Sequence, residues 1–359
     1  MWEKLISDEN IKLAIRNSSK GKRKRNDVMK IYENQDKYVP IIRKYIDDFK
    51  NDKHNPVTIY DGISRKKRTI VVPSYREQIV HHAVVQVLLP MFWKGMYEHS
   101  YGSIPERGTH KGEKTIEKWI KHDKMNVKYC LKMDIRKYFD SINHGILKRK
   151  FARVIKDKRF LNLLFKIIDV TEKGIPLGFY LSQWTANWFL QELDHYIKEE
   201  LGAKHYIRYM DDMVIFGSNK RKLHEIRGKI GKYIKYNLGL DMKQNWQVFR
   251  FDYTNKTRNY GRDLDFMGFR FFRNKTILRK TIMLKITRKA LKIRKKKKET
   301  LHDARQMMSY FGYIKCTDTY KMYLERIKPF IDFKKLRNKI SIIDRRNARC
   351  GEYLKIQTA

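Results

Sequence analysis

The fold of this chain is decided by the stretch Tyr206-Ile207-Arg208-Tyr209-Met210-Asp211-Asp212-Met213-Val214-Ile215-Phe216. Residues 206–209 and 213–216 are apolar runs of the kind found in strands, and two adjacent acids separate them. This pattern predicts a β-hairpin that carries the carboxylates at its tip. Because Asp is common in turns for structural reasons, the acidic pair alone does not indicate a function.

A third acid, Asp134, changes that interpretation. It lies at the end of the alternating run Tyr129–Ile135, which is typical of a strand. If this strand neighbours the hairpin, Asp134 faces Asp211 at the same end of one sheet. Clustered carboxylates repel one another unless a dication binds between them, and oxygen ligands favour Mg²⁺. Two such ions roughly 4 Å apart serve in-line phosphoryl displacement, so the layout predicts metal-dependent phosphoryl transfer.

The composition points to a polyanionic partner. The chain has 359 residues and a formal net charge of +42, and 42% of its residues are hydrophobic. That apolar fraction excludes a disordered polycation, while the charge disfavours an enzyme of small neutral metabolites and favours nucleic acid binding. Three scattered cysteines indicate neither a disulfide framework nor a zinc site. No signal peptide or membrane-spanning run is recognisable, so we expect a soluble, cytoplasmic protein without a membrane partner.

The pattern along the chain predicts three parts. Residues 1–28 form a basic N-terminal arm, whose run 20–25 is either a solvated segment or a phosphate contact. Residues 29–275 mix strands and helices, and residues 276–359 are strongly basic and mostly helical. Within the middle part, the expected helices are 39–49, 76–93 and 184–193. The expected strands are 57–60, 69–72 and 129–135.

The order of the motifs resembles that of reverse transcriptases. Asp134, Phe139 and Asp140 precede Tyr-Met-Asp-Asp as they do in the palm of that family, and the similarity continues in order over roughly residues 30–275. The resemblance implies an α+β, right-hand polymerase fold. Fingers and palm, an antiparallel sheet packed on helices, would occupy residues 29–275, and a basic helical thumb would occupy residues 276–359.

The resemblance also implies the residues of the active site. Asp134, Asp211 and Asp212 would be the catalytic acids and would bind two Mg²⁺ ions, for which Mn²⁺ can substitute, together with the backbone carbonyl of Ile135. Phe139 would lie against the sugar and exclude a 2′-hydroxyl, unless it is an ordinary core residue. The residues implied in dNTP binding are Lys67, Arg68, Arg76, Phe139, Leu177, Gly178 and Gln183. The choice between Lys66 and Lys67 stays open, and a solvated basic face is the alternative for the three cations.

Two further segments are implied in holding nucleic acid. Asp265-Phe266-Met267-Gly268-Phe269 resembles the hairpin that grips the primer, with Phe266, Met267 and Gly268 at its centre. In the thumb, the basic run is the best candidate for phosphate contacts. Its residues are Arg294, Lys295, Lys296, Lys297 and Lys298.

The turn before the second palm helix narrows the subfamily. Leu177-Gly178 followed by Ser182-Gln183 resembles diversity-generating retroelement enzymes, in which this pattern accompanies error-prone copying opposite template adenines. The same pattern occurs in reverse transcriptases of anti-phage defence systems. The partners implied are an RNA template, a DNA or RNA primer, dNTPs, a structured noncoding RNA and a small accessory protein.

The expected function is therefore RNA-templated DNA synthesis from a primer 3′-hydroxyl, in a retroelement that makes mutagenic cDNA. One alternative is a defence enzyme that copies a noncoding RNA. Another is an RNA-templated RNA polymerase, which Phe139 argues against. The last is a non-catalytic RNA-binding protein on a polymerase fold, which the three intact acids argue against.

Overall fold

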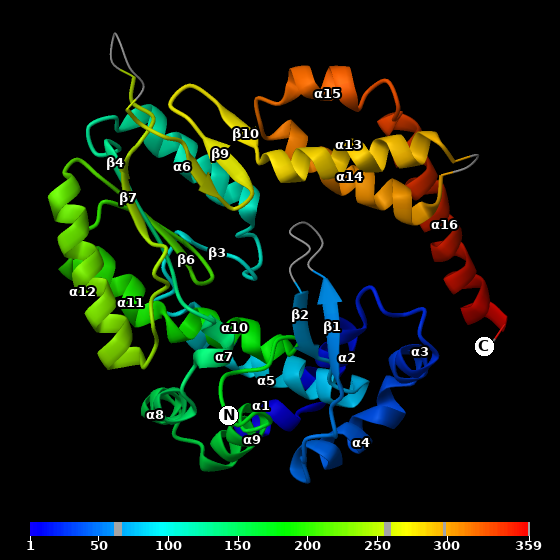
Figure 1. Ribbon diagram of the computed structural model, residues 1–359. Coiled ribbons are helices and arrows are strands. Elements are labelled where there is room, and N and C mark those ends of the chain that lie inside the picture. Colours follow the sequence, from blue (N-terminus) through cyan, green and yellow to red (C-terminus); the bar gives the residue numbers. More distant parts are fainter. Residues whose placement is uncertain (61–66, 255–259, 297–298, 358–359) are drawn as a thin grey trace. The chain divides into compact units, whose positions relative to one another are not determined.

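The computed structural model describes residues 1–60, 67–254, 260–296 and 299–357, with side chains described as far as Arg345 (Figure 1). The chain divides into two compact units. Among the described residues, unit 1 comprises residues 1–60, 67–112 and 123–250, and unit 2 comprises residues 113–122 and the described part of 251–357.

A mixed sheet forms the centre of unit 1. Within the described residues it has five strands in the order β3-β5-β6-β4-β7, in which only β3 and β5 run parallel. The strands are β3 (Ser100–Tyr101), β4 (Tyr129–Asp134), β5 (His205–Tyr209), β6 (Asp212–Gly217) and β7 (Gln247–Arg250). Cys130, Leu131 and Met133 of β4 are buried, as expected of a strand in the middle of a sheet. The two strands predicted to carry the acids are thus neighbours.

Helix α12 (Lys220–Leu238) packs against this sheet. Its apolar residues recur at helical spacing and are buried, whereas its other positions are largely basic. The helix ends at Gly239, whose φ of 64° is the left-handed conformation typical of a residue just past a helix C-terminus.

The N-terminal segment is not the arm that the sequence predicted. Helices α1 (Trp2–Ile6) and α2 (Asp8–Ser19) bury Leu5, Ile11 and Ile15 completely, and α2 packs against α5 (Tyr75–Trp93). The prediction failed because charged residues interrupt a short apolar stripe that becomes evident only at helical spacing. Residues 1–19 therefore belong to the core of unit 1.

The other elements of unit 1 surround this core. Strands β1 (Pro56–Tyr60) and β2 (Lys67–Val71) form a separate antiparallel hairpin. The predicted helix 184–193 begins earlier, at Tyr180, and breaks at Leu190. The remaining helices are α3 (Asn26–Glu33), α4 (Gln35–Asp47), α7 (Tyr138–Ser141), α8 (His144–Val154), α9 (Lys158–Ile168), α10 (Tyr180–Phe189), α11 (Gln191–His195) and the π-helical turn Tyr196–Glu200.

The C-terminal segment of unit 2 begins at Phe251 rather than near residue 275, because a small antiparallel sheet groups with the C-terminal helices. Its strands are β8 (Leu264–Phe266), β9 (Phe269–Phe271) and β10 (Thr276–Leu278). Its helices are α13 (Lys280–Arg294), α14 (Leu301–Lys315), α15 (Tyr320–Arg326) and α16 (Phe333–Gln357), with residues 113–122 of α6 (Thr109–His122). Among the described residues of both units, none of the helices combines the length and apolarity that crossing a membrane would need.

Candidate functional site

The acidic pair lies at the tip of the β5–β6 hairpin. Tyr209 pairs with Asp212, which leaves Met210 and Asp211 as the two residues of the turn. Met210 has a φ of 54°, a left-handed conformation that is unfavourable for a residue other than glycine. The turn is therefore held by its surroundings, and it presents adjacent carboxylates at one end of the sheet.

Asp134 meets this tip from the neighbouring strand. In the antiparallel register of β4 and β6, Asp134 lies directly opposite Asp212. The next residue, Ile135, donates its backbone N–H to the carbonyl of Asp211 over 3.3 Å. The structure thus brings together the four residues predicted to bind metal, although Asp134 pairs with Asp212 rather than with Asp211. Like charges in this arrangement oppose folding, so a stability argument alone does not account for them.

The acids are electrostatically strained. Burial, followed by the nearby charge of Asp134, raises the pKa of Asp211 to about 6. Burial also raises the pKa of Asp212 to about 7; Lys132, 3.9 Å away, opposes that shift, and the other two acids add to it. Carboxyl groups with raised pKa values are typical of sites where a cation or a reacting group completes the charge balance.

The donor set fits hard divalent cations. Asp134 Oδ1 and Asp212 Oδ1 are buried and have no hydrogen-bond partner among the described residues. The other oxygen of Asp134 forms an ion pair with Lys243. Within the part of the chain that the structure describes, no group of three or more His, Cys, Asp or Glu side chains is arranged to hold a metal ion. Buried, unsatisfied carboxylate oxygens are nonetheless the ligands that Mg²⁺ prefers.

A buried hydrogen-bond network around Arg208 contacts the tip of the β5–β6 hairpin, and the residue pattern did not predict it. Arg208 donates through Nε and Nη2 to both oxygens of Asp194, at 2.8 and 2.6 Å. Its Nη1 donates to the carbonyl of Met210 over 2.9 Å and to Asn187 over 3.2 Å. Arg208 is 1% exposed and Asp194 is 0% exposed. The available signal was a charged residue inside an otherwise apolar strand.

The segment around the predicted turn Leu177-Gly178 links Phe139 to the β1–β2 hairpin through backbone hydrogen bonds. Ile175 donates its N–H to the carbonyl of Phe139 over 2.8 Å, and Val71 donates to the carbonyl of Leu177 over 2.7 Å. A Cβ on Gly178 would lie 2.2 Å from the Val71 carbonyl oxygen, so only glycine fits there. Backbone hydrogen bonds therefore connect Phe139 through the segment 175–178 to Val71 of β2.

The other predicted nucleotide contacts lie on the surface of unit 1. Lys67 and Arg68 are exposed on β2, and Arg76 is exposed in the first turn of α5. Gln183 on α10 accepts a hydrogen bond from Ser103 over 2.9 Å. The alternative candidate, Lys66, lies outside the described residues.

The predicted primer grip is a tight hairpin in unit 2. Phe266 and Phe269 end β8 and begin β9, and Met267 and Gly268 form the turn with φ values of 52° and 90°. Phe266 is fully buried. Arg279 donates its N–H to the carbonyl of Gly268 over 3.0 Å, which ties the turn to the start of α13.

The basic run of the thumb is partly engaged within unit 2. Lys296 pairs with Asp303 over 2.6 Å, and the Arg294 guanidinium lies 5.0 Å from the centre of the Phe330 ring. Lys295 follows at the end of α13. Lys297 and Lys298 lie outside the described residues.

Comparison with solved structures supports the fold. The chain is similar to apo telomerase from Candida tropicalis, with a TM-score of 0.51 and 13% identity over 72% of this chain and 52% of that one. A form truncated from the C-terminal domain gives a TM-score of 0.50 and 16% identity over 65% and 55%. The predicted α+β, right-hand polymerase fold is confirmed.

The chain also has sequence similarity to several curated proteins. It is 30% identical to YkfC of Escherichia coli K12 over 37% of this chain and 38% of that protein. It is 27% identical to the group II intron-encoded protein LtrA of Lactococcus lactis over 44% and 28%, and 24% identical to the retron Ec73 reverse transcriptase of Escherichia coli over 52% and 62%. The matches thus span less than two thirds of each relative.

A family model, described as reverse transcriptase (RNA-dependent DNA polymerase), matches residues 51–270, more than half of the chain. That range includes all three acids and the turn at Leu177, and it ends beyond the predicted primer grip. The chain therefore belongs to the reverse transcriptase family.

Proposed function

We propose that this chain is an RNA-templated DNA polymerase that extends a primer 3′-hydroxyl with dNTPs. The observation that carries the proposal is the meeting of Asp134 with Asp211 and Asp212 at one end of adjacent strands, where the buried Oδ1 atoms of Asp134 and Asp212 have no hydrogen-bond partner among the described residues. Structural carboxylates have no reason to be clustered and desolvated in this way. Membership of the reverse transcriptase family supports the same activity.

In this proposal each residue has a defined task. Asp134, Asp211, Asp212 and the Ile135 carbonyl hold two Mg²⁺ ions. When bound, these ions supply activation of the primer hydroxyl and neutralisation of the leaving pyrophosphate. Phe139 excludes a ribose 2′-hydroxyl, and the nascent base pair rests against Leu177, Gly178 and Gln183.

The cations have separate tasks. Lys67, Arg68 and Arg76 pair with the triphosphate, because Arg and Lys side chains match phosphate oxygens. Phe266, Met267 and Gly268 grip the primer, while Arg294 and Lys295–Lys298 contact the duplex backbone.

The first prediction tests the activity. On poly(rA)/oligo(dT) with dTTP and Mg²⁺, the full chain should extend the primer, and Asp211→Asn with Asp212→Asn should lower the rate at least about 1,000-fold, because the metal ligands are lost. Asp48→Asn, on the exposed end of α4, is the control and should leave the rate unchanged. Primer extension is followed on denaturing gels, with circular dichroism to check folding. Undiminished synthesis by the folded double variant would contradict the proposal.

We further propose that the enzyme belongs to a diversity-generating retroelement and makes mutagenic cDNA. Leu177 carries this proposal, because a side chain without a hydrogen-bonding group at the turn cannot make a polar contact to the nascent pair. A defence enzyme that copies a noncoding RNA is the second candidate, because the Leu177-Gly178 and Ser182-Gln183 pattern also resembles that of defence-associated reverse transcriptases. Both roles involve a structured RNA, and the first adds a small accessory protein.

The second prediction separates fidelity from activity. Leu177→Gln should reduce misincorporation opposite template adenines about fivefold or more, because the amide restores a polar contact, worth roughly 1 kcal/mol. Sequencing of cDNA made on a defined RNA measures the error rate at each template base. Leu177→Met preserves an apolar side chain of similar size and should keep the parent error spectrum. Equal error rates at adenines in all three enzymes would contradict the mutagenic role and favour the defence candidate.

A further inference from the structure

Unit 1 contains a basic groove that the proposed chemistry does not use. It has a volume of about 850 Å³ and lies between α12 and the segment 240–245. The cations that line it are Arg136, Arg227, Lys232, Lys235 and Lys243, and the one acid in its lining is Asp241. Lys243 is paired with Asp134, and Arg136 follows Asp134 by two residues, so the groove begins beside the catalytic acids.

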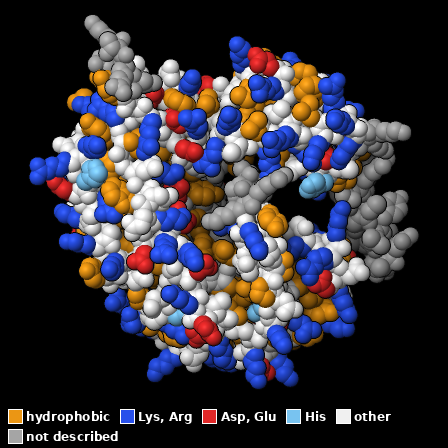
Figure 2. Space-filling view, in the orientation of Figure 1, with side chains coloured by type: hydrophobic (Ala, Val, Ile, Leu, Met, Phe, Trp, Pro, Cys, Tyr) orange, Lys and Arg blue, Asp and Glu red, His pale blue; other side chains and the backbone are white. Residues whose placement is uncertain are grey.

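Most of the cations of this groove have no acid partner among the described residues. Among the described residues, Arg136, Lys232 and Lys235 form no ion pair, and all three are exposed. Arg227 is held in place by Trp246, with its guanidinium 4.0 Å from the ring centre. In the space-filling view, most of the charged side chains visible along the edge that α12 forms are Lys or Arg (Figure 2). A surface of this kind attracts phosphates.

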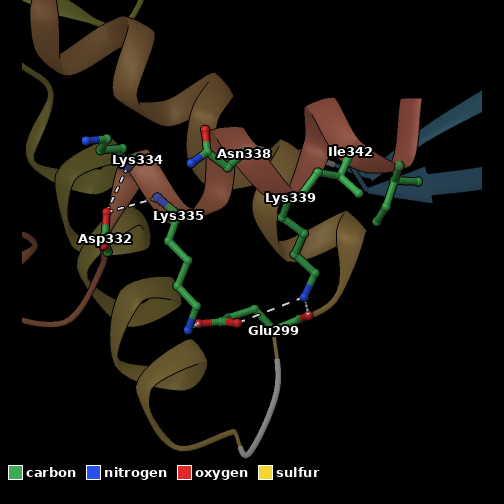
Figure 3. Close-up of a pocket in the computed structure, with 8 residues that line it drawn as sticks. Glu299, Asp332, Lys334, Lys335, Asn338, Lys339 and Ile342 are labelled. Carbon is green, nitrogen blue, oxygen red and sulfur yellow. Dashed lines mark hydrogen bonds and ion pairs between the residues drawn. The ribbon is translucent and has the colours of Figure 1, made fainter. Parts of the chain in front are cut away.

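A second pocket, in unit 2, provides the contrast (Figure 3). Its volume is about 600 Å³ and it is lined by Lys334, Lys335 and Lys339 of α16. Glu299 forms ion pairs with Lys335 and Lys339, over 3.4 and 3.9 Å. Asp332 accepts the backbone N–H groups of Lys334 and Lys335. Two of its three lysines thus have an acid partner, whereas Arg136, Lys232 and Lys235 of the α12 groove have none among the described residues.

The floor of the groove is open because two glycines lie on α12. Gly228 and Gly231 both line it, and a Cβ on Gly228 would meet nothing within 4 Å. Glycine in a helix interior costs about 1 kcal/mol relative to alanine, and packing does not require it at position 228. Missing side chains let a bulky ligand approach the helix backbone closely.

The length and lining of the groove select the ligand. From Arg227 to Tyr236 the helix rises roughly 13 Å, which is long enough for more than one nucleotide of a strand and too long for one pyrophosphate. Tyr236, at the far end, is 76% exposed, which leaves its ring available for a base. Spaced cations with an exposed aromatic ring are typical of surfaces that bind single-stranded nucleic acid.

We propose that this groove binds single-stranded RNA outside the duplex being copied, through phosphate contacts from Lys232 and Lys235 and stacking on Tyr236. The choice of RNA rests on the proposed function, because an RNA-templated enzyme meets its RNA before any DNA exists. The groove thereby holds the RNA next to the site of synthesis.

The test is direct binding by the full chain without dNTPs or Mg²⁺. Fluorescence anisotropy of a labelled 15-nucleotide oligo(U) should show that Lys232→Gln/Lys235→Gln weakens binding about tenfold in 100 mM salt. The slope of log K against log salt should fall by about 1.4, or about 0.7 for each lost phosphate contact. Tyr236→Ala should weaken binding at least about fivefold with an unchanged slope, because stacking is not electrostatic.

Matched controls make the result specific. Lys222→Gln/Lys229→Gln removes the same charge from the same helix outside the groove, and Lys334→Gln removes one from the unit 2 pocket; both should bind within about twofold of the parent. Three results would overturn the proposal. They are an equal loss of affinity in the α12 control, a loss of affinity confined to oligo(dT) or duplex RNA, and unchanged oligo(U) binding by the groove variants. Because binding is read without synthesis, its failure is distinguishable from a failure of the polymerase activity.

Discussion

At the scale of single residues, the geometry of the site depends on a buried ion pair. Arg208 and Asp194 are almost completely shielded from water, and desolvation makes such a pair a poor source of stability. The hydrogen bond from Arg208 to the Met210 carbonyl instead holds a turn in which methionine has an unfavourable backbone conformation. Arg208 is therefore a positioning residue for the neighbouring Asp211.

The third prediction follows from this role. Arg208→Lys retains the charge but loses the fork that reaches Asp194, Asn187 and Met210 together, so the turn should lose its fixed conformation. We expect kcat to fall about tenfold, KM for dTTP to stay within about twofold, and the Mg²⁺ concentration for half-maximal rate to rise. Steady-state kinetics across a Mg²⁺ titration measures all three.

A matched substitution controls for the loss of an arginine. Arg221 on α12 is 92% exposed and, among the described residues, pairs with Glu225 alone, so Arg221→Lys should change none of these quantities. If Arg208→Lys lowers the melting temperature yet leaves kcat and the Mg²⁺ dependence unchanged, the network is structural and does not position the acids.

At this scale the sequence predicted the acids but not their support. Asp134, Asp211 and Asp212 were recognisable because hairpin chemistry and strand alternation are local patterns. Arg208 was visible as a charge in an apolar strand, but its partners Asn187 and Asp194 lie on other elements. Lys243, paired with Asp134, is 109 residues away along the chain. Such partners follow from tertiary packing, which residue spacing does not encode.

At the scale of elements, Asp303 in the first turn of α14 forms an ion pair with Lys289 of α13. Asp303 is 2% exposed, forms ion pairs with Lys289 and Lys296, and forms a capping box with Thr300. Burial by itself would raise the pKa of Asp303. The two lysines and the hydrogen bonds from Thr300 outweigh burial, so its pKa lies well below the ordinary value. The carboxylate thus stabilises the folded state when it is ionised.

The fourth prediction gives the sign of the pH effect. Because the folded state lowers the pKa of Asp303, its stabilisation is present above the unfolded-state pKa of about 4 and is lost as pH falls. Asp303→Asn should lower the free energy of unfolding by about 3 kcal/mol at pH 7. That difference should shrink steadily below about pH 5.

Urea unfolding followed by circular dichroism at several pH values measures this dependence. Asp318→Asn is the comparison, since that acid accepts a backbone N–H from Thr276. A difference between parent and Asp303→Asn that stays constant from pH 7 to pH 3 would show that the loss is steric rather than electrostatic.

Helices with a continuous apolar pattern were predictable from the sequence. Elements whose position depends on tertiary packing were not. The helix expected at 76–93 is α5, Tyr75–Trp93, because Ser74 and Glu77 form a capping box and the apolar positions are continuous. Helix α2 was not predicted because only three of its buried residues, Ile11, Ala14 and Ile15, are apolar, and charged residues flank them. The boundary expected near residue 275 was wrong, because β8 and β9 are short strands that group with unit 2 rather than with the preceding sheet.

At the scale of the whole molecule, the net charge of +42 sets how the protein responds to salt. Several of its ion pairs are exposed, as with Arg25 and Asp27, and such pairs contribute little to stability. We therefore expect salt to stabilise the protein more by screening repulsion among its excess cations than it destabilises the protein by screening its ion pairs. A polyanion should relieve the same repulsion and add its own binding energy.

The fifth prediction distinguishes these effects. Raising NaCl from about 0.1 to 1 M shortens the Debye length from about 10 to 3 Å, so the melting temperature of the free chain should rise by several degrees. Single-stranded RNA should raise it further in 0.1 M salt, and this RNA increment should vanish in 1 M salt as counterion release loses its driving force. Differential scanning fluorimetry measures both, with uncharged dextran as the control for excluded volume. A free chain that melts lower in 1 M NaCl would mean that ion pairs outweigh self-repulsion.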